Sequence, residues 1–221
     1  MRINKYIALA TGLSRRAADA AIEAGRVTYN TRPAQSGQSV DETDKVLLDG
    51  KLLQLPEQTQ TILLNKPVGY VCSRSGQGSK TIYELLPASL QHLKLVGRLD
   101  KDSSGLILLT NDGELAQQLT HPSYRKQKIY EIKLDKALQP LHHQMISDHG
   151  IKLEDGPSQL TLTRLHEGND QSWQITMHEG RNRQIRRTFA ALGYQVVELR
   201  RTQFGNYQLG SMASGTYQSA P

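Results

Sequence analysis

Apolar side chains recur every three or four positions at the start of the chain. This spacing appears within residues 3–10 and again within 17–22, and it predicts two short helices. Gly12 provides a stop for the first helix, whereas Ser14 is a good N-cap for the second and Gly25 is its stop. Each helix is therefore expected to bury one face and to expose the other.

The next apolar segments are too short for helices and predict strands. RVTYN at 26–30 and DKVLLDG at 44–50 form a small β unit after the two helices. QLPEQTQT at 54–61 is then polar, contains a proline and has no periodicity, which is typical of a linker. We therefore predict a first domain over residues 1–54, a linker over 55–60 and a second domain over 61–221.

Strand and helix patterns mix irregularly in the second domain. TILLNKPVGYVCS at 61–73 predicts a strand, a turn and a second strand, and LILLTNDG at 106–113 predicts a buried strand closed by a tight turn. Because no regular βαβ spacing appears, we expect an α+β fold rather than a doubly wound sheet. Further strands are predicted at 128–134, 172–180 and 194–205, and helices at 82–87, 114–121 and 182–193.

The composition is that of a globular protein with an excess of positive charge. Hydrophobic residues make up 37% of the chain and charged residues 22%, which argues against a disordered protein. Lys and Arg number 27 against 21 Asp and Glu, and this excess favours a polyanionic partner. The single cysteine, Cys72, excludes an internal disulfide and a cysteine zinc cluster. Without an apolar signal core or a membrane-length run, we expect a cytoplasmic protein with no membrane association.

Basic side chains are concentrated in the first 33 residues. This stretch contains six Lys and Arg residues but only two acids, Asp19 and Glu23. Charge alone leaves two interpretations open, a solvated face and an RNA-binding surface. If RNA binds here, the candidate contacts are Arg2, Lys5, Arg15, Arg16 and Arg26.

One polar stretch stands directly beside the apolar run of the second domain. VGRLDKDSSG at 96–105 brings an arginine, two aspartates and two serines next to the predicted core strand. A surface turn requires the glycines of this stretch but not its density of charge, so the segment is a candidate for chemistry. The chain contains no GxxxxGK[ST], HExxH, CxxC or GxSxG motif, and its seven histidines lack metal-ligand spacing.

A second unusual stretch is the arginine-rich EGRNRQIRRTFAALG at 179–193. If its helix begins near Asn182, Arg183 and Arg187 share one face and Arg186 points about a quarter-turn away. Such a helix can present arginines to a phosphate backbone on one side and to a buried carboxylate on another.

Together these segments resemble the RsuA/RluB branch of the RNA pseudouridine synthases. The motifs that carry the resemblance occur in the family's order, and residues 1 to about 53 resemble the S-four-like RNA-binding domain at the N-terminus of these enzymes. The resemblance implies a small RNA-binding domain followed by a catalytic domain with a mixed, largely antiparallel sheet. The matching motifs are LLNKPVGYVCS at 63–73, GRLDKDSSGLILLTNDG at 97–113, KIYEIKL at 128–134 and EGRNRQIRRTFAALG at 179–193.

The resemblance also implies an activity and its catalytic residues. Uridine is isomerised to pseudouridine, which requires no cofactor and no metal. Asp100 matches the catalytic aspartate, Tyr130 the active-site tyrosine and Arg186 the arginine expected beside the aspartate. Asp102 is the alternative acid, but the first aspartate of the motif is the matching one. By pattern alone, Tyr130 on its alternating strand is more often a core residue.

The implied partner is ribosomal RNA or a ribosomal assembly intermediate, bound by a monomer. GIKLEDGP at 150–157 is similar to the subgroup that modifies large-subunit RNA, and the small-subunit enzyme is the nearest alternative. A non-catalytic RNA-binding assembly factor and a glycosidase-like hydrolase are further alternatives, although the hydrolase requires a second carboxylate. The candidate RNA contacts of the second domain are Arg98, Arg181, Arg183 and Arg187, for which a solvated face is the plainer interpretation.

Overall fold

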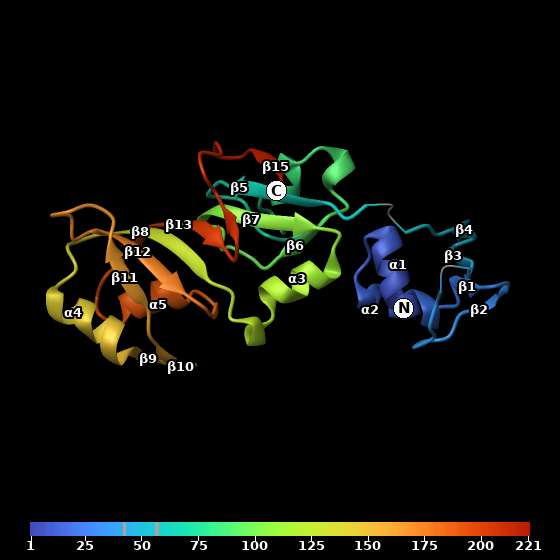
Figure 1. The fold of residues 1–221 in the computed structure, drawn as a ribbon, viewed down its shortest axis with the longest axis horizontal. Coiled ribbons are helices and arrows are strands. Elements are labelled where there is room, and N and C mark those ends of the chain that lie inside the picture. The colour runs from blue at the N-terminus through green and yellow to red at the C-terminus, as the bar shows by residue number, and fades with distance from the viewer. Residues whose placement is uncertain (42, 56–57) are drawn as a thin grey trace. The chain divides into compact units, whose positions relative to one another are not determined.

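A computed structural model describes residues 1–41, 43–55 and 58–221, so that residues 56 and 57 of the predicted linker lie outside the described part. The chain folds into two compact units, whose elements are labelled in Figure 1. The first unit comprises residues 1–60 and 88–94, and the second comprises 61–87 and 95–221.

The first unit contains the two predicted helices, and local capping fixes their ends. Helix α1 ends at Gly12, which adopts a left-handed φ of 78°. The Ser14 hydroxyl accepts a hydrogen bond from the backbone amide of Ala17 and so begins α2. Helix α2 ends two residues before Gly25, the predicted stop. The bounds are α1 Ile3–Thr11 and α2 Arg15–Glu23.

A small antiparallel sheet completes the first unit. Its strands follow the order β2-β1-β3-β4, and the two predicted segments supply the central pair, β1 and β3. Ile3, Ile7, Ile22 and Val46 are buried between the helices and this sheet. The strands are β1 Val27–Tyr29, β2 Arg32–Pro33, β3 Val46–Leu48 and β4 Lys51–Leu52.

The second unit is built on a nine-stranded mixed sheet, which confirms the predicted α+β class. Seven strands follow the order β11-β12-β8-β13-β7-β5-β15, while β14 pairs with β13 and β6 with β7. Strands β13 and β7 are parallel, whereas the pairs β11–β12, β12–β8, β8–β13, β13–β14, β7–β5 and β5–β15 are antiparallel. The bounds are β5 Thr61–Lys66, β6 Lys94–Val96, β7 Ser104–Thr110, β8 Lys128–Leu134, β11 Thr161–Arg164, β12 Ser172–Met177, β13 Val196–Phe204, β14 Tyr207–Gln208 and β15 Tyr217–Ser219.

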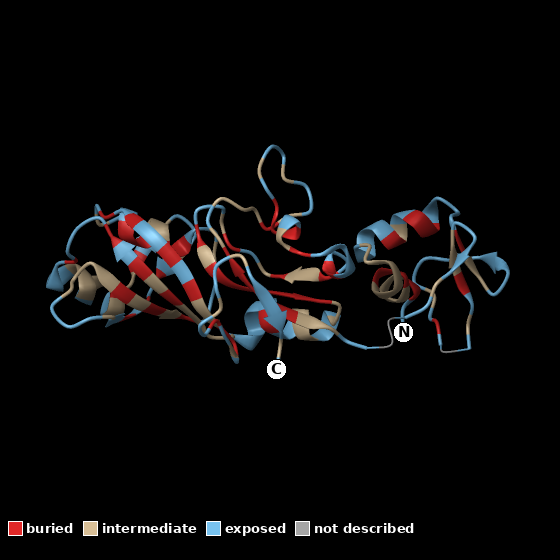
Figure 2. Ribbon diagram, turned by 90° about the horizontal axis from the view of Figure 1, so that it is seen from above, coloured by how far each residue is buried: buried red, intermediate tan, exposed pale blue. Residues whose placement is uncertain are grey.

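The burial of each strand follows its sequence pattern. After Ser104, every residue of β7 is buried, as its continuous apolar run predicts, whereas β12 alternates between buried and intermediate residues (Figure 2). Helix α3 contacts β7 and helix α5 contacts β13, while β9 and β10 form a separate hairpin. The remaining bounds are α3 Gly113–Thr120, α4 Pro140–Gln144, a π-helical turn Met145–His149, β9 Ile151–Leu153, β10 Gly156–Ser158 and α5 Gln184–Ala190, with short 3₁₀ turns at Ile82–Leu85, Ala88–Leu90 and Pro122–Tyr124.

Two local predictions for the second unit are wrong. The second strand expected within 61–73 is reduced to one isolated bridge between Val71 and Thr81, because Pro67 lacks an amide donor and Gly69 turns the chain at a φ of 94°. The segment 82–87 forms a 3₁₀ turn rather than an α-helix.

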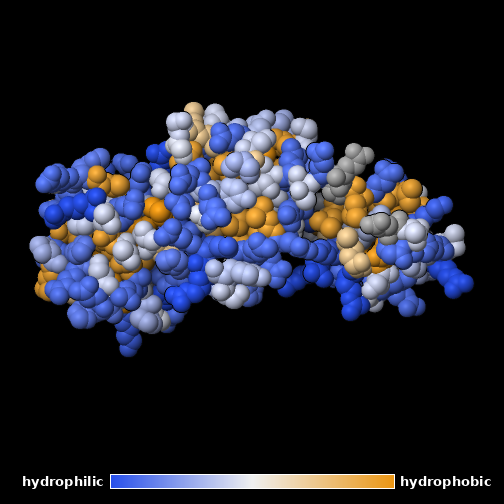
Figure 3. All heavy atoms as spheres, viewed as in Figure 1, coloured by the Kyte–Doolittle hydropathy of each residue, from blue (hydrophilic) through white to orange (hydrophobic). Residues whose placement is uncertain are grey.

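Hydrophilic residues cover much of the visible surface of each unit, as Figure 3 shows. None of the helices in the described part of the chain is both long and apolar enough to cross a membrane.

Candidate active site

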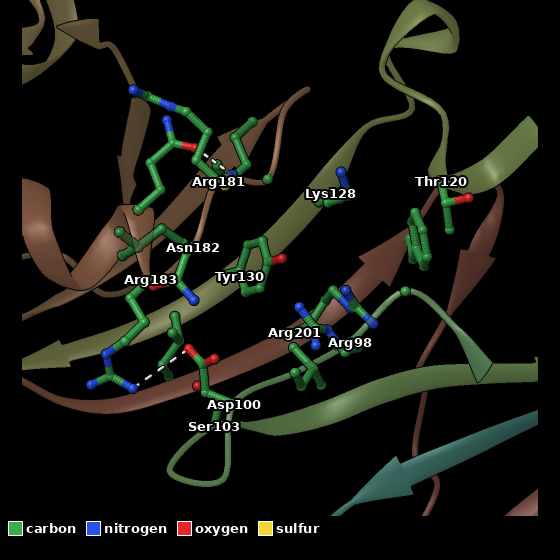
Figure 4. Close-up of a pocket in the computed structure, with 18 residues that line it drawn as sticks. Arg98, Asp100, Ser103, Thr120, Lys128, Tyr130, Arg181, Asn182, Arg183 and Arg201 are labelled. Carbon is green, nitrogen blue, oxygen red and sulfur yellow. Dashed lines mark hydrogen bonds and ion pairs between the residues drawn. The ribbon is translucent and has the colours of Figure 1, made fainter. Parts of the chain in front are cut away.

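A pocket of about 340 Å³ opens in the second unit. Segments that are far apart in the sequence line it. The main ones are the loop that contains Asp100, strand β8, the turn before α5 and strand β13 (Figure 4). The two segments that the sequence singled out, VGRLDKDSSG and EGRNRQIRR, therefore meet in one place.

Backbone contacts fix the loop that carries Asp100. The Ser103 amide donates to the carbonyl oxygen of Asp100 at 3.1 Å, and the Gly69 amide donates to that of Lys101 at 2.8 Å. The fully buried amine of Lys66 donates to the carbonyl oxygen of Ser103 at 2.6 Å and to that of Pro67 at 3.0 Å. Burial lowers the pKa of Lys66, whose polar partners here are carbonyl groups.

Gly105 is required by a close approach of two strands. It belongs to β7 and adopts a φ of 100°. A Cβ atom there would lie 2.2 Å from the carbonyl oxygen of Arg201 on the parallel strand β13. Glycine therefore allows β13 to pass next to the end of the Asp100 loop.

The two aspartates of the loop have different partners. Asp100 Oδ2 lies 3.6 Å from Nη1 of Arg183, and its side chain is 36% exposed. Asp102 accepts two hydrogen bonds of 3.0 Å from Arg183, and its Oδ2 lies 3.3 Å from Nε of Arg186 without the alignment of a hydrogen bond. The hydrogen bond from Arg183, and then the charge of Arg186, lower the pKa of Asp102. Asp102 is thus an anchored anion, whereas Asp100 is open to the pocket.

The ion pair expected between Asp100 and Arg186 is not among those of the described residues, and Arg183 takes its place. Arg186 instead donates to the backbone carbonyl oxygens of Val196 at 2.6 Å and Asp102 at 2.8 Å. The predicted helix start was also wrong, because Arg183 adopts a left-handed φ of 45° and α5 begins only at the next residue.

Arg181 and Arg187 hold the β9–β10 hairpin. Arg181 donates to the carbonyl oxygens of Asp155, Gly156 and Pro157 at 2.8–3.1 Å. Arg187 pairs with both carboxylate oxygens of Asp155 at 3.0 and 2.7 Å, and these hydrogen bonds lower the pKa of that carboxyl group. Both guanidinium groups are therefore occupied by the protein itself, and their role as RNA contacts stays a prediction.

Tyr130 lies in the pocket wall, on the interior strand β8. Its side chain is buried, with 8% exposed, and it lines the pocket together with Asp100 (Figure 4). In the antiparallel register it stands directly opposite Arg201 of β13, so the two side chains share one face of the sheet. Tyr130 therefore meets both expectations. It is buried, as the alternation of its strand predicted, and it lines the pocket, as the family resemblance implied.

Two cationic residues of the pocket were missed from the sequence, Lys128 and Arg201. Burial lowers the pKa of Lys128, and the positive charge of Arg201 lowers it further. The alternation of β13 could have predicted that Arg201 is buried. It places Arg201 on the same side of the strand as the buried Leu199, whereas Arg200 is exposed on the other side. Among the other candidates, Arg98 is exposed at the pocket.

The basic candidates of the first unit differ in their contacts. Arg26 forms a bidentate pair with Asp49, Arg2 donates to the Gly37 carbonyl oxygen, and Arg15 reaches Asn4 at 3.4 Å. The Arg16 side chain is exposed and that of Lys5 is partly buried. RNA binding by these residues stays a prediction. Within residues 1–41, 43–55 and 58–221, no three His, Cys, Asp or Glu side chains are grouped so that they could hold a metal ion.

Comparison with known families gives the pocket its context. Residues 60–191 match the family described as RNA pseudouridylate synthase, and residues 1–55 match the S4 domain. The chain belongs to the RNA pseudouridylate synthase family. The family resemblance and the S-four-like first domain expected from the sequence are confirmed, and so is the enzyme class, an isomerase.

Relatives of this pseudouridine synthase cover nearly its whole length. An uncharacterized RNA pseudouridine synthase of Aquifex aeolicus is 39% identical over 99% of this chain and 89% of its own. The small subunit pseudouridine synthase A of Pasteurella multocida is 35% identical, covering 99% and 95%, and the large subunit pseudouridine synthase B of Bacillus subtilis is 36% identical, covering 97% and 89%. A crystal structure of a pseudouridylate synthase superposes with a TM-score of 0.71 at 33% identity, over 100% of this chain and 96% of that one.

Proposed function

We propose that this enzyme converts a uridine of ribosomal RNA into pseudouridine and that Asp100 is its catalytic carboxylate. The observation that carries the proposal is the position of Asp100, which faces a pocket with Tyr130 in its wall and the Arg183 guanidinium 3.6 Å away. A pocket of about 340 Å³ is small compared with an RNA helix, so the target nucleotide must be extruded into it.

The reaction rearranges atoms within one nucleotide. The bond between N1 of uracil and C1′ of ribose breaks, the base turns while it is held, and a bond forms between C5 and C1′. The proton of C5 is lost and N1 gains one, so no electrons leave the nucleotide. An ionised Asp100 serves this sequence by attacking the ribose or the base, or by taking a proton from the sugar. The positive charge of Arg183 balances the carboxylate in each of these routes.

Tyr130 provides a platform and a proton carrier in this proposal. Its ring stacks on the uracil, which recovers about 1–3 kcal/mol of the cost of extrusion, and its hydroxyl group takes part in proton transfer. Arg186 acts through the backbone, since its bonds to the carbonyl oxygens of Asp102 and Val196 hold the Asp100 loop against β13.

We assign the target to large-subunit RNA and keep small-subunit RNA as the second candidate. The hairpin sequence GIKLEDGP resembles the large-subunit subgroup, and Arg181 and Arg187 hold this hairpin. Curated relatives of both kinds are about equally similar, at 36% and 35% identity. The proposed substrate is ribosomal RNA or an assembly intermediate in the cytoplasm, bound by one copy of the chain.

Replacement of the carboxylate tests the assignment of Asp100. Asp100→Asn keeps the shape of the side chain but removes its charge, so pseudouridine formation should be abolished while RNA affinity stays within about threefold. Asp112→Asn, the same change outside the pocket, is the matched control. It should keep full activity, because an asparagine Oδ1 can still accept the hydrogen bonds from the amides of Glu114 and Leu115 that cap α3. Substantial turnover by pure Asp100→Asn would refute the assignment. Mapping pseudouridines in both ribosomal RNAs of cells that lack the protein identifies the target.

A further inference from the structure

Arg201 is a buried cation without a counter-ion. Its side chain is 2% exposed, and no ion pair of the described residues includes it. Nε donates to the carbonyl oxygen of Leu106 at 2.8 Å, whereas Nη2 is fully covered and meets no acceptor in the described part of the protein. A buried donor without an acceptor is destabilising, and more so when it is charged.

Nearby groups compensate this charge only in part. The guanidinium carbon lies 4.7 Å from the ring centre of Phe204, a cation–π contact. The amine of Lys128 lies 5.5 Å from the same ring, so a second cation shares this compensation. The positive charge of Arg201 also helps to lower the pKa of Lys128, which shows that the two cations influence each other. This end of the pocket is therefore electropositive before a substrate enters.

The position of Arg201 relates this charge to the proposed reaction. It lines the same pocket as Asp100, and the register of β13 and β8 places it directly opposite Tyr130 (Figure 4). A base that stacks on Tyr130 would thus lie on the same face of the sheet as Arg201. Guanidinium groups donate hydrogen bonds and accept none, so the complementary ligand group is an oxygen.

We propose that Arg201 binds a carbonyl oxygen of the extruded uracil and balances the negative charge that the base acquires when its bond to ribose breaks. The electron pair of the N1–C1′ bond stays with the base, where it is shared between N1 and the two carbonyl oxygens. Removing a donor of this kind slows related reactions by about 10²–10³-fold, because its interaction strengthens as the charge develops. This inference rests on the proposed function.

A base oxygen suits the site better than a phosphate. Arg201 is covered, so its ligand must enter the pocket, whereas the phosphates of an extruded nucleotide remain attached to the RNA outside. The exposed guanidinium group of Arg98 at the same pocket is better suited to a phosphate. When the oxygen bound is O4, the donor also favours uracil over cytosine, since the amino group at C4 of cytosine would meet another donor.

Single-turnover rates test the proposal, with in vitro transcripts of 16S and 23S ribosomal RNA and subunits assembled from them as substrates. Arg201→Met should lower the rate roughly 10²–10³-fold, with RNA affinity within about threefold of wild type. Arg201→Lys keeps the charge but loses the second donor nitrogen, so its rate should lie between those of wild type and Arg201→Met. Arg200→Met is the matched control, because Arg200 is exposed on the opposite face, 3.8 Å from Glu131, and should leave the rate unchanged.

Chemical rescue separates a contact with the base from a role in packing. Guanidinium ion added to Arg201→Ala should raise the rate at least tenfold, whereas urea, of similar shape but neutral, should not. If the wild-type enzyme is active and both Arg201→Met and Arg201→Lys react within threefold of its rate, the inference about Arg201 is overturned. The proposed function is unaffected by that result. A parallel loss of affinity without rescue would likewise overturn the inference, because Arg201 would then be structural. A wild type that modifies no substrate would overturn the proposed function first.

Discussion

Replacing Gly105 by alanine would place a methyl group where the backbone of β13 already lies. The new Cβ atom would be 2.2 Å from the carbonyl oxygen of Arg201, 2.7 Å from its nitrogen and 2.9 Å from its carbonyl carbon. These three atoms belong to the main chain and cannot rotate away. Relief therefore requires β7 and β13 to separate at their parallel register, next to the Asp100 loop.

Two costs add up in this variant. Holding alanine at a φ of 100° costs about 1–3 kcal/mol, because only glycine adopts this region without strain. Forcing a methyl group into packed surroundings costs a further 1–3 kcal/mol or so. We therefore expect the free energy of unfolding of the second unit to fall by about 2–6 kcal/mol.

Urea unfolding followed by the fluorescence of Trp173 measures this loss. Trp173 is the only tryptophan in the chain, and its buried position on β12 makes the signal specific to the second unit. Gly113→Ala is the matched control, because a Cβ atom there meets nothing within 4 Å, and its midpoint should stay close to wild type. A Gly105→Ala protein within 0.5 kcal/mol or so of wild type would refute the close-approach reasoning.

Other parts of the site give three shorter predictions. Asp102→Asn should keep activity within about tenfold and cost about 0.5–1 kcal/mol at pH 7, since the carboxylate is 45% exposed. Because pairing lowers the pKa of Asp102, this stability is present above the ordinary pKa near 4 and is lost as the pH falls through the lowered value, so urea midpoints of variant and wild type should converge in acid. Tyr130→Phe should slow single turnover about 10²–10⁴-fold if the hydroxyl group moves a proton, and a rate equal to wild type would leave only stacking. Removing residues 1–55 should weaken RNA binding and flatten its dependence on salt, whereas an unchanged salt slope would mean that the basic face is only solvated.

Local signals in the sequence predicted the fold well. The N-cap at Ser14 and the left-handed Gly12 depend on neighbouring residues, so the first helices could be predicted closely. The runs that became β7, β8 and β12 were visible because burial follows periodicity.

Features that depend on distant contacts could not be predicted in the same way. Arg183 ends up outside its helix, in a left-handed conformation, and its side chain pairs with Asp102 from 81 positions earlier in the chain. Gly105 is explained only by the backbone of Arg201, which lies 96 residues later. The alternation around Arg201 itself was readable, but two adjacent arginines suggest a solvated surface until the sheet partners are known.

The strand order of the second sheet has a consequence for synthesis. Strand β13 lies between β7 and β8, although it follows both by more than 60 residues in the chain. Until β13 is made, the strand that follows Asp100 and the strand that carries Tyr130 have no shared neighbour. At about 5–20 residues per second, the ribosome completes β13 roughly 4–15 s after Tyr130. The pocket of a nascent chain therefore stays incomplete until Val196–Phe204 has been synthesised.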